Sequence, residues 1–250
     1  MYTNHGFENE ANIEKAFHKH KFKDLNPNLK AVATKLFGEL SDDDEFECHQ
    51  TNEFIKPDIV LSCKGKDCFI SIKLERSIGM HMEFIDTFVN FIRSINISEK
   101  TIDTILLYQF GDGTKDGSGG KRMNYGEIFK QLESDIAKAN YELNDHLSII
   151  NQVIDRVIFQ GVDPVAEPAE YIYVGTVESG QIISKKQVKS LLRNKNWHYY
   201  DNLHIGPIML RPHARYSNKT IVSEKSRRQI ICYWARFVDD VSYMSKRYYF

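Results

Sequence analysis

The spacing of hydrophobic residues changes several times along the first 100 residues. Apolar side chains recur every three or four positions over residues 9–22 and 26–40, which predicts two helices. Residues 59–61 and 68–74 are instead short runs rich in Ile, Val and Phe, separated by the polar sequence KGKD, and they predict a β-hairpin. Helical spacing returns over residues 80–95.

The pattern beyond residue 100 predicts further helices and strands. A continuous apolar run at residues 101–110 is typical of a buried strand, and residues 125–139 and 143–160 have helical spacing. The sequence PVAEPAE at residues 164–170 reads as a linker. After it we expect strands at residues 171–177, 205–216 and 228–238 and a short helix at residues 184–194.

These elements predict an α/β protein in two parts. Residues 1–163 would form a core in which helices flank a mixed sheet, and residues 164–250 would form a smaller β-rich subdomain. A chain of 250 residues is long enough for either one large domain or two modest ones.

Composition excludes several classes of protein. The hydrophobic fraction of 42% and the charged fraction of 27% are near globular averages, which argues against general disorder. No apolar run reaches the roughly 18 residues of a membrane span, and the first ten residues lack the apolar segment of a signal peptide. The four cysteines form no CxxC pair, so we expect reduced cysteines in a cytoplasmic protein rather than a zinc site.

The formal net charge of −1 conceals two segments of opposite charge. Residues 181–250 contain 14 lysines and arginines but four aspartates and glutamates, a local charge of +10. Residues 1–180 therefore carry −11. The basic segment suits a polyanion such as nucleic acid, and the acidic segment offers carboxylates for a cation.

Residues 56–83 contain the most informative group of charged side chains. Asp58 precedes the first predicted strand of the hairpin, and Ser71 and Lys73 share a face near the end of the second. A hairpin brings these two positions to the same end of a sheet. Glu83, placed early in the predicted helix at residues 80–95, would point to the same place.

Two carboxylates and a lysine at one sheet edge suit phosphodiester hydrolysis. Carboxylate oxygens bind Mg²⁺, which retains several waters and takes phosphate oxygens as further ligands. The cation neutralises charge in the transition state and lowers the pKa of water, while the lysine positions or deprotonates the attacking water.

The pattern Pro57-Asp58, Ser71-Ile72-Lys73 and Glu83 resembles the PD-(D/E)XK nuclease superfamily, the fold of many type II restriction endonucleases. Ser71 stands where the second acidic residue usually lies, as in the variant PD…SxK…E, in which the acidic residue has moved to the following helix. Glu75 competes with Glu83 for this role.

The resemblance extends over residues 6–110 and implies a restriction-endonuclease-like core with the order α-β-β-α-β. It also implies a further metal ligand from the first helix. Glu10 and Glu14 are both available there, and Glu10 is preferred because it lies at the start of the helix.

Each of these residues also has an ordinary structural interpretation. Aspartate after proline is common in turns, and lysine at a strand end is commonly a solvated charge. The Gly-rich segment at residues 111–120 lacks the features of a phosphate-binding Walker loop. It is either a flexible surface loop, a segment that wraps nucleic acid, or a loop in which Asp112 and Thr114 organise the edge of the site.

Basic residues at the end of the Gly-rich segment and in the C-terminal part are candidates for DNA contacts, because phosphates bind lysine and arginine and because arginine reads guanine. The candidates are Lys121, Arg122, Arg211, Arg215, Lys225, Arg227 and Arg228.

The sequence therefore predicts a Mg²⁺-dependent endonuclease that cuts double-stranded DNA, of the type II restriction class, acting in the cytoplasm as a homodimer. Asp58, Glu83 and Glu10 would bind metal, Lys73 would act on the water, and Ser71 would be a minor polar contact. A repair or antiphage nuclease without sequence specificity, an inactive nucleic-acid-binding protein of the same fold, and a protein-binding module remain alternatives.

Overall fold

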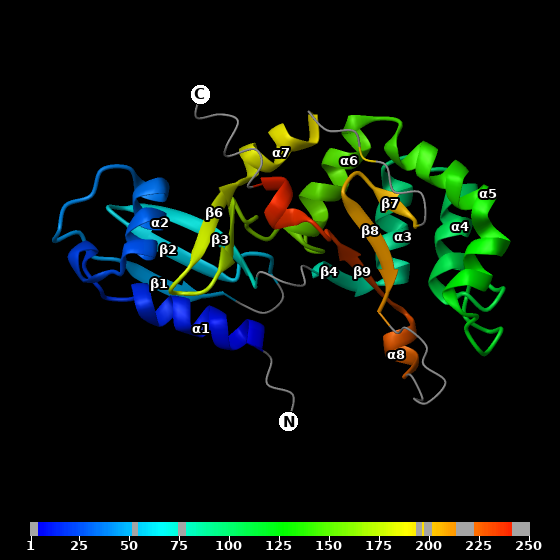
Figure 1. Cartoon of the computed structure of the whole chain (residues 1–250), viewed down its shortest axis with the longest axis horizontal. Helices are drawn as coiled ribbons and strands as arrows, with labels where there is room; N and C mark the ends of the chain where they lie inside the picture. The colour runs from blue at the N-terminus through cyan, green and yellow to red at the C-terminus, as the bar shows by residue number, and fades with distance from the viewer. Residues whose placement is uncertain are drawn as a thin grey trace. The chain divides into compact units, whose positions relative to one another are not determined.

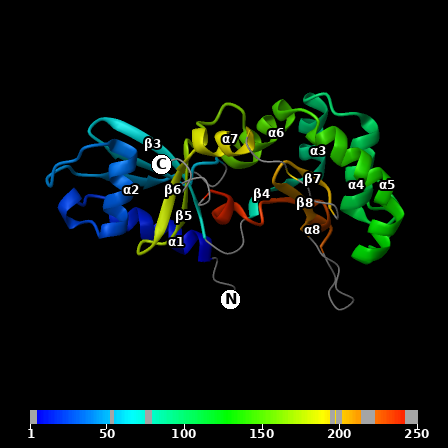
Figure 2. The same cartoon turned by 45° about the horizontal axis from the view of Figure 1, so that its top comes forward.

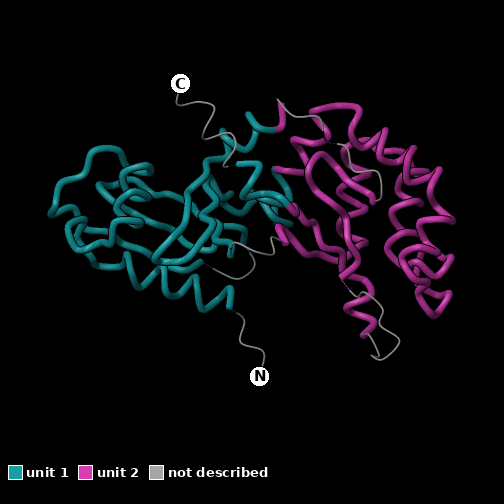
Figure 3. The backbone as a smooth tube through the Cα atoms, viewed as in Figure 1, with its two compact units in different colours: residues 1–78, 155–191, 236–250 teal, residues 79–154, 192–235 magenta. Residues whose placement is uncertain are grey.

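The computed structural model divides the chain into two compact units (Figure 3). Unit 1 comprises residues 1–78, 155–191 and 236–250, and unit 2 comprises residues 79–154 and 192–235. The structure describes residues 5–51, 55–74, 79–193, 197, 202–213 and 223–241.

Unit 1 contains a five-stranded mixed sheet with the order β1-β2-β3-β5-β6. Its strands are β1 (Glu47–Gln50), β2 (Ile59–Cys63), β3 (Lys66–Lys73), β5 (Tyr171–Gly175) and β6 (Gly180–Ser184). Neighbouring strands are antiparallel except β3 and β5, which are parallel. A parallel pair needs a crossover connection, and here the chain between β3 and β5 includes much of unit 2.

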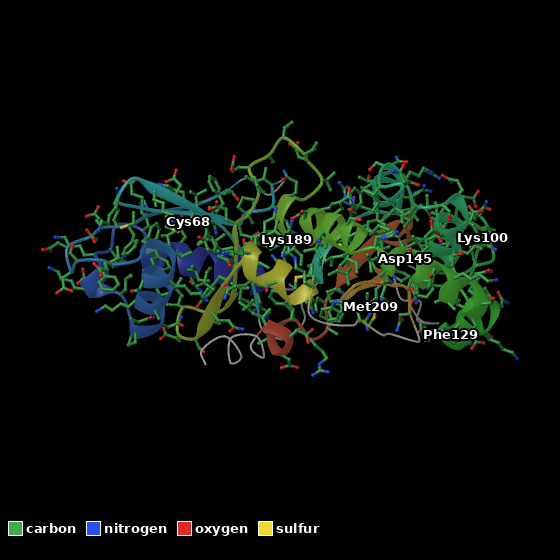
Figure 4. All side chains as sticks on the ribbon, turned by 90° about the horizontal axis from the view of Figure 1, so that it is seen from above. Cys68, Lys100, Phe129, Asp145, Lys189 and Met209 are labelled. Carbon is green, nitrogen blue, oxygen red and sulfur yellow. The ribbon has the colours of Figure 1, made fainter. Side chains whose placement is uncertain are left out.

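Helices α1 (His5–Phe17) and α2 (Pro27–Phe37) pack on this sheet. Ile13 and Phe17 of α1 belong to one buried cluster together with residues of α2, β2 and β3. Cys68, labelled in Figure 4, is a buried member of that cluster. Unit 1 also contains a 3₁₀ turn (Phe22–Asp24), a π-helical turn (Asp155–Gln160) and most of α7 (Lys185–Arg193).

Unit 2 contains a four-stranded antiparallel sheet with the order β4-β9-β8-β7. Its strands are β4 (Gly79–Phe84), β7 (His204–Ile205), β8 (Ile208–Pro212) and β9 (Gln229–Tyr233). The helices of this unit are α3 (Ile85–Ser94), α4 (Glu99–Phe110), α5 (Tyr125–Asn144), α6 (Leu147–Ile154) and α8 (Glu224–Arg227). In Figures 1 and 2, α3, α4 and α5 lie to one side of the sheet.

The predicted mixed α/β class and several elements are confirmed. The β2–β3 hairpin forms, with Ile59 opposite Ile70. Helices also form where the spacing predicts them: α1, α2 and most of α7 in unit 1, and α5 and α6 in unit 2. None of the four cysteines forms a disulfide. Within the described ranges, no helix combines the length and the apolarity that crossing a membrane requires.

The prediction of a strand at residues 101–110 is wrong, because this run lies in helix α4. The Ser98 side chain caps the helix by accepting a hydrogen bond from the Thr101 N–H, and Gly111, with φ 57°, ends it in the left-handed region. Ile102 and Ile105 are buried three positions apart. The run is continuous because this helix is buried around much of its circumference.

The start of the predicted helix at residues 80–95 is also wrong, because residues 79–84 form strand β4 and α3 begins only at Ile85. Strand β4 pairs with β9, whose residues lie far along the chain. Such a distant partner leaves no mark on the local hydrophobic spacing.

The two units divide the chain differently from the predicted parts, residues 1–163 and 164–250. Strand β5 follows residue 163 but pairs with β3, so the sheet of unit 1 crosses the predicted boundary. The predicted basic subdomain is likewise distributed: β6 belongs to unit 1, whereas β7, β8 and β9 belong to unit 2.

Candidate active site

The β2–β3 hairpin brings the predicted residues Asp58, Ser71 and Lys73 together in unit 1. Asp58 lies immediately before β2, and its backbone N–H donates to the carbonyl of Ile70 at 2.8 Å. Ser71 and Lys73 follow two and four positions after Phe69 on the same face of β3. The predicted convergence of these three side chains at one end of the hairpin is therefore confirmed.

A single oxygen of the Asp58 carboxylate, Oδ2, accepts the hydrogen bonds from the neighbouring residues of β3. The Ser71 hydroxyl donates to Oδ2 at 2.9 Å, the Ile72 N–H donates to the same atom, and Lys73 Nζ lies 3.3 Å from it. Lys73 Nζ also donates to the carbonyl of Ile72 at 2.8 Å. Within the described part of the chain, Oδ1 of Asp58 has no hydrogen-bond partner and remains available to a ligand.

The three side chains differ in their access to solvent. Asp58 and Lys73 are each 21% exposed, whereas Ser71 is buried at 1%. The buried hydroxyl of Ser71 thus donates to the Asp58 carboxylate from the interior, whereas the aspartate and the lysine are partly exposed to solvent.

Helix α1 contributes a second carboxylate, that of Glu10. The neighbouring Asn9 is buried and donates from Nδ2 to the carbonyl of Gly175 at 2.9 Å, at the end of β5. The residue before Gly175, Val174, is the register partner of Lys73. This contact fixes the first turns of α1 beside the end of β3.

Glu10 has a strongly altered pKa. Burial and the negative charge of Asp58 raise the pKa of Glu10 to about 7, and the positive charge of Lys73 opposes this increase. Glu10 has no hydrogen-bond donor among the described residues. Glu10, Asp58 and Lys73 are therefore close enough to interact electrostatically. The choice of Glu10 over Glu14 as a metal ligand stays a prediction.

These residues fit a Mg²⁺ ion by the chemistry of the groups present. Glu10 and Asp58 are two hard oxygen donors whose mutual repulsion a cation would relieve, and Mg²⁺ is commonly bound by one or two carboxylates together with waters and phosphate oxygens. Among the residues that the structure describes, no group of three or more His, Cys, Asp or Glu side chains is arranged for a metal.

Glu83 does not lie on a helix as predicted. It belongs to strand β4 in unit 2, where it is buried and its Oε1 lies 3.3 Å from Nε2 of His81. Asp58 and Lys73 belong to unit 1, so unit 1 brings together Glu10, Asp58 and Lys73 without Glu83. The alternative ligand, Glu75, lies outside the described residues.

The candidate DNA-binding residues fall into distinct structural settings. Arg122 donates to the carbonyls of Tyr108 and Gln109 and so caps the end of α4, and burial lowers the pKa of its guanidinium. Lys121 beside it is exposed. Arg215 lies outside the described residues.

Two of the C-terminal arginines have acidic partners. Arg227 lies 2.9 Å from Asp112, whose side chain is completely buried, and Arg228 lies 2.7 Å from Asp86. Asp112 also accepts hydrogen bonds from the backbone and hydroxyl of Thr114. The Gly-rich segment is therefore a folded loop of unit 2, joined through Asp112 to Arg227, the last residue of α8.

Arg211 and Lys225 are in a different position. Arg211 stacks on the ring of Tyr233, with 4.5 Å between its Cζ and the ring centroid, and Lys225 is exposed on α8. Neither has a carboxylate partner within the described part of the chain. The structure thus separates the predicted basic residues into paired and unpaired cations.

Sequence reasoning missed strands β1 and β6 and the contact that positions α1. Strand β1 has the polar sequence ECHQ, which carries no apolar alternation. A polar residue, Asn9, within the apolar face of a predicted helix was the available signal, since a buried amide needs a partner.

Comparisons of the chain with protein-family models, with curated proteins and with solved structures give no match.

Proposed function

We propose that the protein is a metal-dependent nuclease that hydrolyses phosphodiester bonds at the cluster formed by Glu10, Asp58 and Lys73. The observation that carries this proposal is the convergence of two carboxylates and a lysine from α1, from the residue before β2 and from β3. The altered pKa of Glu10 adds support, because perturbed carboxylates gather at sites of chemistry.

The arrangement of unit 1 supports a restriction-endonuclease-like core. Helix α1 precedes the hairpin that carries Pro57-Asp58 and Ser71-Ile72-Lys73, in agreement with the resemblance. The expected final strand is absent at residues 101–110, and β5 instead lies parallel beside β3. Glu10 takes the role of second carboxylate that the motif lacks at Ser71.

The residues of the chain divide the work. Glu10 and the free Oδ1 of Asp58 would hold Mg²⁺, and when bound this ion neutralises phosphate charge and makes the attacking water more acidic. Lys73, anchored to Asp58 Oδ2 and to the carbonyl of Ile72, presents its ammonium group to the phosphate and orients the water. Ser71 keeps the aspartate in one orientation.

We propose double-stranded DNA as the substrate, with cleavage of the type II restriction class. The excess of basic residues over residues 181–250 supports an anionic polymer as substrate. Cleavage of both strands by one site per chain favours a homodimer, in which each copy cuts one strand. A nuclease without sequence specificity has the same site chemistry and differs only in its products.

Incubation of the purified protein with plasmid DNA, in Mg²⁺ or in EDTA, tests the proposal. We expect discrete fragments only with Mg²⁺, whereas a smear would indicate a nuclease without sequence specificity. Asp58→Ala and Lys73→Ala should abolish cleavage and leave DNA binding largely intact, because they remove a metal ligand and the group that acts on the water.

A control for these variants exists at the other end of the same hairpin. Asp67 accepts a hydrogen bond from Ser62 at 2.6 Å, so Asp67→Ala removes a comparable contact away from Glu10. It should retain cleavage. Undiminished cleavage by Asp58→Ala or Lys73→Ala would show that the site is wrong, and folded wild-type protein that binds DNA without cutting it in Mg²⁺ would identify an inactive relative of the fold.

A further inference from the structure

The four-stranded sheet of unit 2 has one covered face and one open face. On the covered face, Glu83, Leu210, Ile230 and Cys232 are buried. Their neighbours along each strand point the opposite way. Met82 and Phe84 of β4 are 48% and 44% exposed.

The register of the strands places the remaining outward side chains beside these two. Met82 is opposite Ile231, which is opposite Arg211, and Tyr233 is opposite Met209. The residues of this face are Met82, Phe84, Met209, Arg211, Gln229, Ile231 and Tyr233, with His204 of β7 buried beside Met209; Met82 and Phe84 are exposed and the other listed residues are partly buried. The open face of an antiparallel sheet is usually polar, so this combination of apolar, aromatic and basic groups without a carboxylate calls for a ligand.

Arg211 gives the open face its charge. Its guanidinium stacks on Tyr233 and its Nε donates to the sulfur of Met209 at 3.2 Å. Within the described residues it has no carboxylate to neutralise it. An aromatic ring supports a guanidinium from one side and leaves most of its N–H groups directed outward, where they can donate to an anion.

A second unpaired cation lies on the short segment that leads into this sheet. Lys225 is exposed on α8, which leads directly into β9, and it too lacks a carboxylate partner among the described residues. Arg227 and Arg228 on the same short segment are already paired with Asp112 and Asp86. The face therefore combines the exposed ring of Phe84 and the partly buried ring of Tyr233 with cations that have no acidic partner among the described residues.

We propose that this open face binds unpaired bases of a DNA strand, with bases stacked on Phe84 and the Arg211–Tyr233 pair and with phosphates near Arg211 and Lys225. The choice of DNA rests on the proposed nuclease function. Flat rings and a cation without acidic partners complement a single strand, whose bases expose their faces and whose backbone is anionic. A duplex offers its phosphates but keeps its bases stacked inside.

Fluorescence anisotropy with a labelled 20-nucleotide single strand, in EDTA and with the full chain, tests this proposal. Phe84→Ala should weaken single-strand binding about 5- to 150-fold, the range for loss of one base–aromatic stack, and Phe84→Tyr should restore it. Arg211→Ala should weaken binding and reduce its salt dependence. Binding of a blunt duplex of the same length should be unaffected by Phe84→Ala.

A matched control is Tyr141→Ala, which removes a ring that is 75% exposed on α5, outside the sheet. It should bind the single strand as the wild type does. Thermal melting of each variant establishes that it is folded, and Met82→Ala provides a second change on the face if Phe84→Ala does not fold.

Several results would overturn the inference. These are equal single-strand binding by Phe84→Ala and the wild type, equal losses in Phe84→Ala and Tyr141→Ala, or a dimer in sedimentation that Phe84→Ala dissociates, which would assign the face to a second copy. The assay contains no metal, so its outcome is independent of cleavage. Single-strand binding that requires Phe84 would stand even if the plasmid were not cut, and plasmid cleavage would leave the binding result unchanged.

Discussion

Asp58 and Glu10 are two neighbouring carboxylates in opposite states of hydrogen bonding. Asp58 receives two hydrogen bonds and an ammonium group on one oxygen. Glu10 has no donor among the described residues and lies near the charge of Asp58. Because its pKa is about 7, Glu10 exchanges its negative charge for a proton near neutral pH.

The pKa of Glu10 predicts how stability depends on pH. Because this pKa is about 7 in the folded protein against an ordinary value of 4.5, the folded state binds the proton more tightly than the unfolded state. The free energy of unfolding should fall as pH rises from about 4.5 to about 7. Urea unfolding at pH 5 and pH 8 in EDTA should show a smaller loss for Glu10→Gln than for the wild type.

Glu14→Gln is the control for this measurement, since Glu14 lies on the same helix and is also half-buried. It should follow the wild type. An identical pH dependence in the wild type and Glu10→Gln would contradict the altered pKa and the proximity of Glu10 to Asp58 on which it depends.

The residues of the candidate site were predictable to the extent that their neighbours are local in sequence. Asp58, Ser71 and Lys73 belong to one hairpin, so strand alternation and a short turn determine their convergence. Glu83 was misplaced because its strand is completed by β9, a partner that local spacing does not reveal. The basic residues were identified by type, but whether each has an acidic partner depends on tertiary contacts.

Helix α4 shows what decides whether an apolar run forms a helix or a strand. Residues 101–110 contain several β-branched residues, which favour strands, yet Ser98 and Gly111 end the segment as helix caps do. Glu142 of α5 then accepts hydrogen bonds from the Ser98 N–H, the Ser98 hydroxyl and the Thr101 hydroxyl. The first turn of α4 is thus held by its own cap and by the adjacent helix.

This carboxylate should be important for the stability of unit 2. Glu142→Gln should lower the free energy of unfolding by about 1–3 kcal/mol, because it weakens hydrogen bonds to a charged acceptor. Urea unfolding at pH 7 measures the loss, and Glu133→Gln, an exposed position on the same helix, should change it by less than about 0.5 kcal/mol. A loss as small as that of Glu133→Gln would mean that Glu142 does not hold α4.

At the scale of the whole molecule, the charge of the C-terminal segment is less available than its composition suggests. Arg227 and Arg228 are paired, and removal of Arg227 would leave the buried Asp112 without its cation. Such a loss commonly costs several kcal/mol, so Arg227→Ala would damage folding rather than report on binding. Arg211 and Lys225 are the informative positions.

The salt dependence of duplex DNA binding should distinguish Arg211 and Lys225 from exposed lysines elsewhere in unit 2. Arg211→Ala combined with Lys225→Ala should reduce the slope of log affinity against log salt by roughly 1–2, since each phosphate contact contributes about 0.9. Removal of Lys130 and Lys138, two exposed lysines of α5, is the charge-matched control and should leave the slope unchanged. Equal slopes in all three proteins would exclude Arg211 and Lys225 as phosphate contacts.

The order in which the strands are joined has a consequence for synthesis of the chain. The sheet of unit 1 is complete once β6 has left the ribosome, whereas β4 must await β9 before it can pair. At about 5–20 residues per second, that delay is on the order of ten seconds. During this interval the nascent chain exposes an unpaired strand that carries Met82 and Phe84. The time before β9 emerges is therefore when binding by a chaperone would protect the chain most.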